Sequence, residues 1–408
     1  MVVPKPVFKA SKEVEGYYLS FQIGNALLSE GKAYALEARV TSPFMEFIND
    51  IGLEVLTNNK PVFMPVTNIV LAGSLENDCG VDPALVVLLL DRGITLDENA
   101  QCRLVRLKEA GFKIAFYNMP DFHAIEEFLP LADYIFAPYE TSEIMPITRA
   151  VRMGRHAARV IASGVNTDAV FERTAGIGIQ YFEGAFYKML SGKHDNRVSP
   201  LQVNYLQLLN QVAQEDFDFG KFSGVVQRDP ALVIQFLKMV KSGDSGREIT
   251  SLRHAAAMVG QKEIKRWVTT AVASSLNQGK PSEITRISLL RAKFCENLAG
   301  LFEMGVHMEN LFLMGLFSSL DVILEMPIEK ALGMIVVPEK VKIALTTGEN
   351  DFGEIYRFIM LYEQGDWQEV SRFALIHNLA VNDIFKAYYE SLTWYGRLIN
   401  TQVDSDVN

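Results

Sequence analysis

Residues 85–117 read LVVLLLDRGITLDENAQCRLVRLKEAGFKIAFY, and this stretch decides the fold of the first half of the chain. It begins with the apolar run Leu85 to Leu90 and ends with the β-rich run Phe112 to Tyr117. Between them, residues 97–110 carry apolar side chains on one side of a helix and charges on the other, and Gly111 follows as a stop signal. A strand, a helix and a strand in this order predict a parallel βα unit.

The same alternation continues on both sides of this stretch. Further strands are expected at residues 61–66, 134–137, 157–162 and 178–182. Such spacing is typical of an α/β barrel or a doubly wound sheet. Residues 2–10 and 16–21 lie close together and predict an antiparallel start. A full barrel usually takes ~250 residues. Only residues 1–195 are available, so we expect a small (β/α) barrel that could be incomplete.

The second half has a different pattern. Residues 195–199 read as a linker, and Ser199-Pro200 is a strong helix start. Successive helices and no strand are expected from there on, at residues 201–214, 219–227, 230–241, 251–259, 262–276, 283–302, 310–319, 352–363 and 381–397. The sequence therefore predicts two domains, an α/β domain at 1–195 and an all-α domain at 199–408.

Composition excludes several classes of protein. The net charge is −10, shared equally by the two halves, so a nucleic-acid interface has little electrostatic support. Three cysteines without a CxxC pair argue against a disulfide framework or a zinc-thiolate site. The longest apolar run, residues 84–90, is far shorter than the ~20 residues of a membrane helix. We expect a cytoplasmic protein without membrane or nucleic-acid partners.

Few residues suggest bound metals or nucleotides. The six histidines stand far apart, and neither a Walker A motif nor GxGxxG occurs. His254 is interpreted as a buried structural histidine rather than a ligand. At the expected strand ends, where barrel enzymes place their catalysts, Asp91 is the one carboxylate and there is no lysine. Because a divalent cation needs several converging oxygen anions, we predict no metal or other cofactor.

Short motifs in a fixed order carry a resemblance over nearly the whole chain. They are residues 107–115 (LKEAGFKIA), 165–167 (VNT), 178–184 (GIQYFEG), 228–232 (RDPAL), 249–255 (ITSLRHA), 291–295 (RAKFC), 315–318 (GLFS) and 365–367 (GDW). The chain resembles bacterial signalling proteins that join an EAL domain to an HDOD domain, also called a modified HD-GYP domain. Active EAL domains are cyclic di-GMP phosphodiesterases with two divalent metals.

The resemblance implies that the EAL site is degenerate. The glutamate of the family's name falls on Tyr18, the asparagine of the next strand on Pro65, and a strand glutamate near Leu88, with Asp91 a few residues on. The paired aspartates fall on Tyr117 and Asn118, the lysine that assists the attacking water on Phe136, and its neighbouring aspartate on Pro138. A later glutamate and lysine fall on Ser163 and Gly164, another glutamate on Asn166, and Glu183 stands where glutamine is usual. A two-metal clamp with so many ligands replaced is expected to be inactive.

In the helical half, the His-Asp pair of metal-dependent relatives falls on Ser318 and Ser319, which cannot replace it as metal ligands. The other HDOD signature positions, Asp229, Pro230, Ser251, His254 and Gly260, are interpreted as structural. The resemblance implies a pseudo-enzyme that binds other signalling proteins in a cyclic di-GMP network, where relatives bear on motility. Two alternatives stay open: a residual cyclic di-GMP phosphodiesterase, and a cyclic di-GMP receptor. The second is disfavoured because two phosphates need Arg or Lys at the rim.

Overall fold

The structure is a computed structural model. It describes residues 1–22, 52–189 with gaps at 118, 120–122, 140–147 and 149–157, 207–212, 217–240 with gaps at 229–231, 234–235 and 238, 251–276, 282–335 and 337–406. The chain forms two compact units. The first contains Met1–Met189 and Leu361–Lys386, and the second contains Leu190–Met360 and Ala387–Asn408. The domain boundaries 1–195 and 199–408 stay a prediction, and in the structure Leu361–Lys386, here called the returning segment, groups with the first unit.

The first unit contains a closed barrel of eight strands in chain order. They are β1 (Val2–Lys9), β2 (Val14–Phe21), β3 (Val62–Pro65), β4 (Val86–Leu90), β5 (Lys113–Tyr117), β6 (Tyr134–Pro138), β7 (Arg159–Ser163) and β8 (Tyr181–Glu183). β1 is antiparallel to β2 and to β8, and all other neighbours are parallel. The predicted fold is confirmed, and the barrel is complete rather than open.

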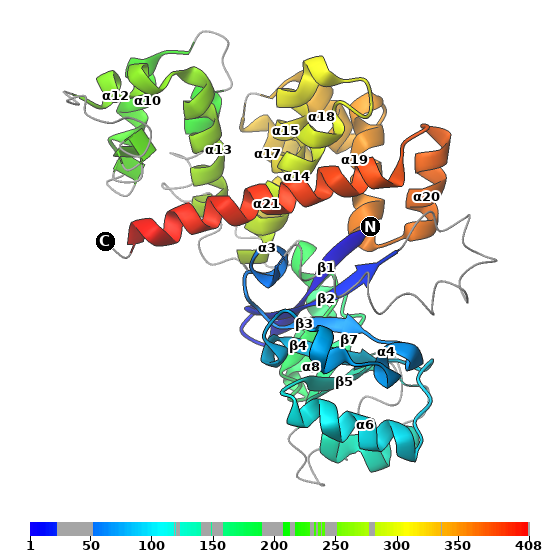
Figure 1. Ribbon diagram of the computed structural model, residues 1–408. Coiled ribbons are helices and arrows are strands. Elements are labelled where there is room, and N and C mark those ends of the chain that lie inside the picture. Colours follow the sequence, from blue (N-terminus) through cyan, green and yellow to red (C-terminus); the bar gives the residue numbers. More distant parts are fainter. Residues whose placement is uncertain are drawn as a thin grey trace. The chain divides into compact units, whose positions relative to one another are not determined.

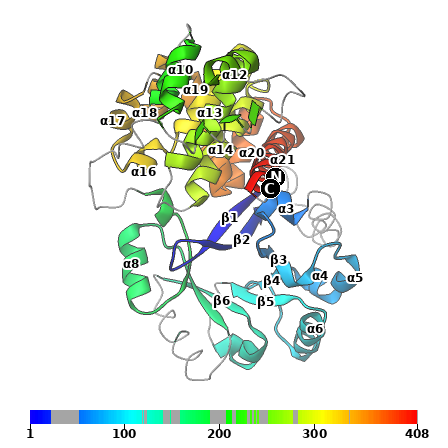
Figure 2. The ribbon, with the colours of Figure 1, turned by 90° about the vertical axis from the view of Figure 1, so that its left-hand side faces the viewer.

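Helices cover the barrel between its strands. They include α3 (Leu53–Thr57), α4 (Asn68–Ala72), α5 (Leu75–Asp78), α6 (Glu98–Glu109) and α8 (Asp168–Gly176). Figures 1 and 2 show α4, α6 and α8 outside the ring of strands. Strand β4, VVLLL, is buried at every residue, which is typical of a parallel strand covered on both faces.

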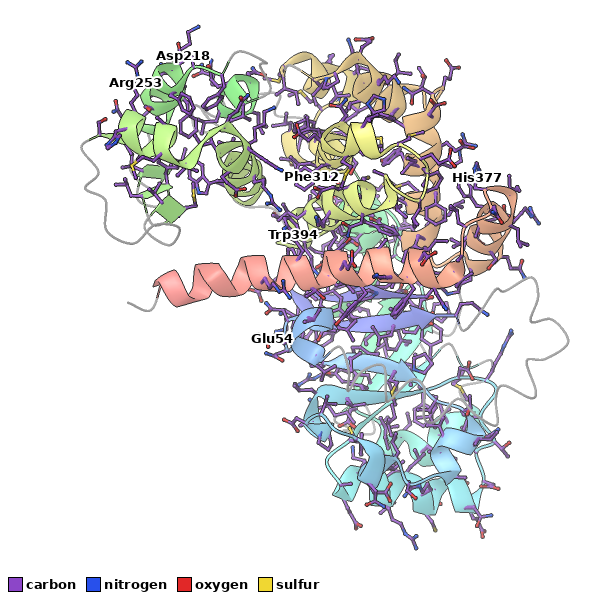
Figure 3. All side chains as sticks on the ribbon, turned by 45° about the horizontal axis from the view of Figure 1, so that its top comes forward. Glu54, Asp218, Arg253, Phe312, His377 and Trp394 are labelled. Atoms are coloured by element: carbon purple, nitrogen blue, oxygen red, sulfur yellow. The ribbon has the colours of Figure 1, made fainter. Side chains whose placement is uncertain are left out.

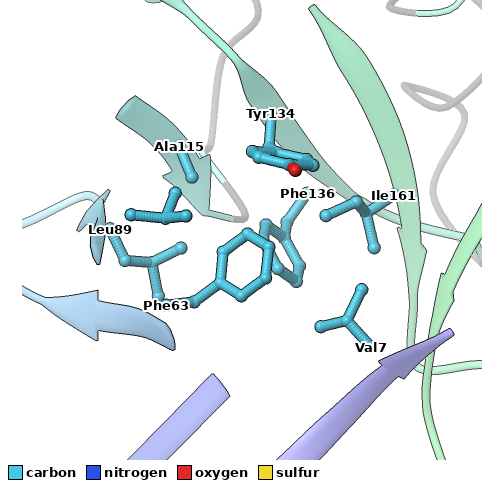
Figure 4. Close-up of a cluster of buried hydrophobic side chains, with 8 residues drawn as sticks. Val7, Phe63, Leu89, Ala115, Tyr134, Phe136 and Ile161 are labelled. Carbon is cyan, nitrogen blue, oxygen red and sulfur yellow. The ribbon is translucent and has the colours of Figure 1, made fainter. Parts of the chain in front are cut away.

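The barrel interior is filled by side chains from six strands, which Figure 4 shows. They belong to Val7, Phe63, Val87, Leu89, Ala115, Tyr134, Phe136 and Ile161, all at most 2% exposed. Tyr18, Tyr117 and Tyr181 pack against this cluster. The barrel therefore encloses a packed core rather than a channel.

Charged groups close the end of the barrel where the parallel strands begin. A register shift in the β1–β2 pair leaves Glu15 without a partner residue on β1. Its carboxylate accepts hydrogen bonds from Tyr134 Oη (3.2 Å) and Arg159 Nη1 (2.9 Å), and it lies 3.2 Å from Lys9 Nζ. Burial raises the pKa of Tyr134 to about 12, so the phenol stays neutral and donates to Glu15.

The returning segment packs on the first two strands. It comprises the end of α19 (Asp351–Gln364), α20 (Trp367–Ile376) and the start of α21 (Val381–Asp406). Tyr362 is fully buried and its hydroxyl donates to the carbonyl of Val2 (3.2 Å), while Trp367 Nε1 donates to Ser20 Oγ (3.2 Å). The returning segment therefore completes the packing of the barrel unit.

The described part of the second unit is helical. Its elements are helical residues 207–212, α10 (Phe219–Val226), α12 (Leu252–Val259), α13 (Gln261–Leu276), α14 (Ser282–Leu298), α15 (Met308–Phe317), α16 (Leu320–Leu324), α17 (Ile328–Gly333) and α18 (Glu339–Thr346), with the greater part of α19 and of α21. Figure 3 marks Phe312 on α15 and Trp394 on α21, whose rings meet edge to face at 6.2 Å. No helix of the described ranges has the length and apolar character needed to cross a membrane.

Candidate functional site

The ends of the parallel strands bring most of the predicted barrel residues together. Side chains two residues apart on a strand point to the same face. Phe63, Tyr134 and Ile161 face the interior, so the residues that follow them at this spacing do too. The side chains at this end belong to Tyr18, Pro65, Tyr117, Phe136, Pro138, Ser163 and Glu183, and we call this group the mouth.

Aromatic rings fill the centre of the mouth. Tyr18 and Tyr117 stack nearly parallel with ring centroids 5.4 Å apart, and Tyr117 contacts Phe136 at 5.2 Å. Phe136 in turn packs on Phe63 at 5.4 Å. The rings therefore form a continuous stack from the mouth into the core. Two of its members stand where the resemblance expects carboxylates.

A lysine that the sequence did not predict lies in the mouth. Because β1 is antiparallel to its neighbours, its first residues lie at the ends of the other strands, and Lys5 is in register with Tyr18. Lys5 shares the interior face with Val7, and its Nζ donates to the carbonyl of Gln364 in the returning segment (2.7 Å). Burial lowers the pKa of Lys5, and the charge of Glu183 acts against this shift.

Glu183 is the carboxylate whose charge acts on Lys5. It accepts a hydrogen bond from the backbone N–H of Gly164 (3.2 Å). Burial raises the pKa of Glu183 above its ordinary value of 4.5, although the Gly164 hydrogen bond and the charge of Lys5 act in the opposite direction. The mouth therefore holds a carboxyl group that folding favours in its protonated form.

This shift predicts a stabilising substitution, Glu183→Gln. A carboxyl whose pKa is raised by folding contributes full stability below its unfolded pKa, near 4.5, and loses that contribution as the pH rises. Glutamine has nearly the same shape, can accept from Gly164 and is neutral at every pH. We expect E183Q to have a larger free energy of unfolding than wild type at pH 8, measured by urea denaturation, with a difference that shrinks toward pH 4.5.

Glu109→Gln on the exposed side of α6 is the matched control, and it should change stability little at any pH. An E183Q protein that was less stable than wild type at pH 8 would show that the ionised Glu183–Lys5 pair stabilises the mouth.

Asp91, the one rim carboxylate of the sequence prediction, lies at the end of β4 and is exposed. Its Oδ1 accepts from the backbone N–H of Gly93 (2.8 Å) and so closes a turn. Burial raises the pKa of Tyr18, and the charges of Glu183 and Asp91 add to this effect. Tyr18 is thus a neutral hydroxyl group in the mouth.

Other predicted positions lie outside the mouth. Leu88 is fully buried on the opposite face from Val87 and Leu89, so it points away from the barrel interior. Gly164 and Asn166 are exposed on the segment after β7, where Asn166 Oδ1 accepts from Ala185 N (3.1 Å). Asn118 lies outside the described residues.

Metal-binding side chains are not grouped in the part of the chain that the structure describes. No three His, Cys, Asp or Glu residues there lie close enough together to hold a metal ion.

A buried arginine contacts the two serines that stand at the predicted His-Asp position of the second unit. Arg291, on α14, donates from Nη1 to Ser318 Oγ (3.0 Å) and Ser319 Oγ (3.1 Å). Ser318 Oγ donates to the carbonyl of Gly315 (2.6 Å). Burial raises the pKa of the neighbouring Asp321, and the charge of Arg291 opposes this shift. The two serines therefore hold a guanidinium group, a cation supplied by the chain itself.

Close packing of α14 and α15 places the arginine there. A Cβ added to Gly315 would lie 2.4 Å from the backbone carbonyl of Arg291, so only glycine allows this approach. The resemblance motifs at residues 291–295 and 315–318 thus meet at this crossing.

The described members of the remaining HDOD signature positions lie on α12 or at its ends. Ser251 caps α12 and accepts from the backbone N–H of His254 (3.1 Å), and Gly260 ends the helix with φ +84°. His254 is exposed, so its interpretation as a buried histidine was wrong. Its place in the first turn of α12 leaves its side chain outside the apolar face. Asp229 and Pro230 lie outside the described residues.

Comparison with known proteins agrees with this organisation. Residues 198–335 match the family model described as HDOD domain. The uncharacterized protein YuxH of Bacillus subtilis (strain 168) is 27% identical over 419 residues, covering 98% of this chain and 99% of that protein. The cyclic di-GMP phosphodiesterase CdgJ of Vibrio cholerae serotype O1 is 29% identical over 294 residues, covering 71% of this chain and 68% of that protein.

A solved structure of an EAL domain protein from Listeria monocytogenes EGD-e is similar to part of the chain. It has a TM-score of 0.36 at 14% identity and covers 45% of this chain and 86% of that one. The predicted EAL–HDOD organisation is confirmed by the HDOD match and by the relatives. Degeneracy of the barrel site stays a prediction.

Proposed function

Since the chain joins a closed barrel to an HDOD domain in the manner of EAL–HDOD proteins, we propose that it is a non-catalytic regulatory protein of a bacterial cyclic di-GMP network. In this proposal it is cytoplasmic and acts by binding other signalling proteins. The relative named cyclic di-GMP phosphodiesterase supports the network, and the chemistry of the mouth supports the absence of turnover.

The observation that carries the proposal is the content of the mouth. Two-metal phosphodiester hydrolysis needs anionic oxygens that converge on both ions. Here the centre is a stack of Tyr18, Tyr117 and Phe136, and the charge that acts on Glu183 is that of the partly buried cation Lys5. A lysine ammonium repels a divalent cation, and the rings take up the volume of its ligands.

Exposed apolar side chains support action through partners. Leu375 and Ile376 are adjacent at the end of α20 and are 53% and 71% exposed. In the second unit, Val306 is 91% exposed. Contiguous exposed apolar side chains, such as the adjacent pair Leu375 and Ile376, are characteristic of surfaces that bind other proteins, whereas a single one such as Val306 is ordinary.

The test is incubation of the purified full chain with cyclic di-GMP and Mg²⁺ or Mn²⁺, followed by chromatography of the nucleotides. We expect no hydrolysis above a protein-free blank, while CdgJ of Vibrio cholerae serves as the positive control. Manganese titration followed by electron paramagnetic resonance should likewise detect no ion bound in the barrel. Turnover that Asp91→Ala abolishes would refute the proposal.

A cyclic di-GMP phosphodiesterase is the second candidate. Two observations favour it: the name of the relative CdgJ, and the fact that the charges of Asp91 and Glu183 both act on Tyr18. One carboxylate in the mouth and one exposed at its rim could hold a single ion weakly. The hydrolysis assay separates the two candidates directly, because only the enzyme converts cyclic di-GMP.

A further inference from the structure

We propose that a polar pocket in the second unit binds a small phosphate ester that also carries an N–H or O–H donor, with a nucleoside monophosphate as the representative ligand. The pocket lies between helical residues 207–211 and α10 and is separate from the mouth. The inference does not depend on whether the barrel is catalytic.

The cavity has the size of a ligand site. Its volume is about 460 Å³, within the range of roughly 300–1,000 Å³ for small-molecule pockets. Its walls are formed by Gln207, Asn210, Gln211, Lys221, Gly224, Val225 and Arg228. A Cβ at Gly224 would meet no atom within 4 Å, so this wall is open toward the cavity.

The charge of the lining selects an anion. Lys221 and Arg228 are cationic, and no carboxylate is among the described lining residues. Arg228 Nη1 donates to Gln207 Oε1 (2.9 Å), which orients the guanidinium group. An oriented guanidinium and an ammonium together suit the several oxygens of a phosphate group.

Asp218, the acidic residue at the start of α10, is already engaged. Asp218 caps α10 and accepts from the backbone N–H groups of Gly220 (2.8 Å) and Lys221 (3.1 Å), and these bonds lower its pKa. Figure 3 marks it beside Arg253 of α12, whose charge also acts on it. Asp218 is therefore compensated partly by Gly220 and Arg253, outside the pocket lining, and partly by Lys221, whose charge also acts on it.

A buried acceptor specifies the second feature of the ligand. Gln211 Oε1 is buried and has no hydrogen-bond partner among the residues that the structure describes. Leaving such a group unsatisfied is unfavourable, and a donor on the ligand would remove this cost. Inorganic phosphate lacks a base edge that could reach this atom, whereas a purine base offers N–H donors.

The test uses the full-length chain and three probes, GMP, guanosine and inorganic phosphate, with isothermal titration calorimetry. We expect GMP to bind, phosphate to bind at least about tenfold more weakly, and guanosine to show no heat at the same concentrations. Arg228→Gln should weaken GMP at least about tenfold. Gln211→Leu should weaken GMP while leaving phosphate unchanged.

Two controls define the site. Arg253→Gln removes a charge of the same kind on α12, outside the lining, and should leave GMP affinity unchanged. Gly224→Leu should block GMP by filling the open wall, and circular dichroism checks that each variant is folded. The proposal fails if GMP gives no heat at millimolar concentration, or if Arg228→Gln and Arg253→Gln weaken it equally.

Discussion

Gly184→Ala is expected to abolish the folded barrel. Gly184 follows β8 with φ +148°, a region that is essentially restricted to glycine. An added Cβ would lie 2.0 Å from the carbonyl oxygen of Val165 and 2.6 Å from its nitrogen. These are backbone atoms held by hydrogen bonds to Glu183 (2.9 Å) and Phe186 (3.1 Å), so neither side can move away easily.

We expect a loss of about 4 kcal/mol or more in the free energy of unfolding, a large part of the 5–15 kcal/mol of a typical domain. Urea denaturation and soluble yield measure it. Gly176→Ala, at the end of α8 with nothing within 4 Å, is the matched control and should be neutral or slightly stabilising. A fully stable Gly184→Ala protein would mean that the β7–β8 connection does not have the described conformation.

Arg291→Met is expected to be the most damaging side-chain replacement in the second unit. Arg291 is 6% exposed, and its removal takes the donor from two buried serine hydroxyls and removes a positive charge that acts on Asp321. We expect a loss of about 2–4 kcal/mol, measured by urea denaturation. The loss should be larger at pH 8 than at pH 5, because the pKa of Asp321 is already raised and would rise further without the arginine.

Lys293→Met on the same helix provides the comparison. Lys293 pairs with Glu296 at 2.8 Å in a partly exposed i,i+3 pair, which is worth about 0–1 kcal/mol. If both substitutions had equal small effects, the buried arginine would not hold the α14–α15 crossing. If Arg291→Met bound manganese, the guanidinium would be identified as the group that excludes an ion.

Most strands could be predicted from local patterns. Runs such as residues 85–90 and 112–117 are apolar and bounded by turn signals, so the structure places β4 and β5 almost where they were expected. Closure of the barrel could not be predicted, because it depends on β1 pairing with β8 at the other end of the domain. Residues 1–195 are fewer than the ~250 residues of a usual barrel, so length alone did not predict closure.

The candidate site was predicted less completely, for a geometric reason. The site residues were expected directly after each strand, which holds for parallel strands. Lys5 lies at the beginning of β1, and an antiparallel strand presents its beginning at the same end of the barrel. The available signal was the hairpin predicted at residues 2–21, which implies this reversal.

Arg291 and Leu88 illustrate two other limits. Arg291 was recognised as part of a motif, but its contact with Ser318 depends on how two helices cross. Leu88 was placed on the family's glutamate, whereas strand alternation directs it away from the interior. Local periodicity does not encode the contacts between distant segments. It also does not show which side chains of a fully apolar strand point into the barrel.

The returning segment has a consequence for biosynthesis. Residues 190–360 are translated between the last strand of the barrel and the helices that complete its packing. At roughly 5–20 residues per second, a nascent barrel waits on the order of 10–30 s for Tyr362 and Trp367 to leave the ribosome. During this interval Val2 and Ser20 lack their partners from the returning segment. The surface of the nascent barrel that the segment later covers is then accessible to chaperones.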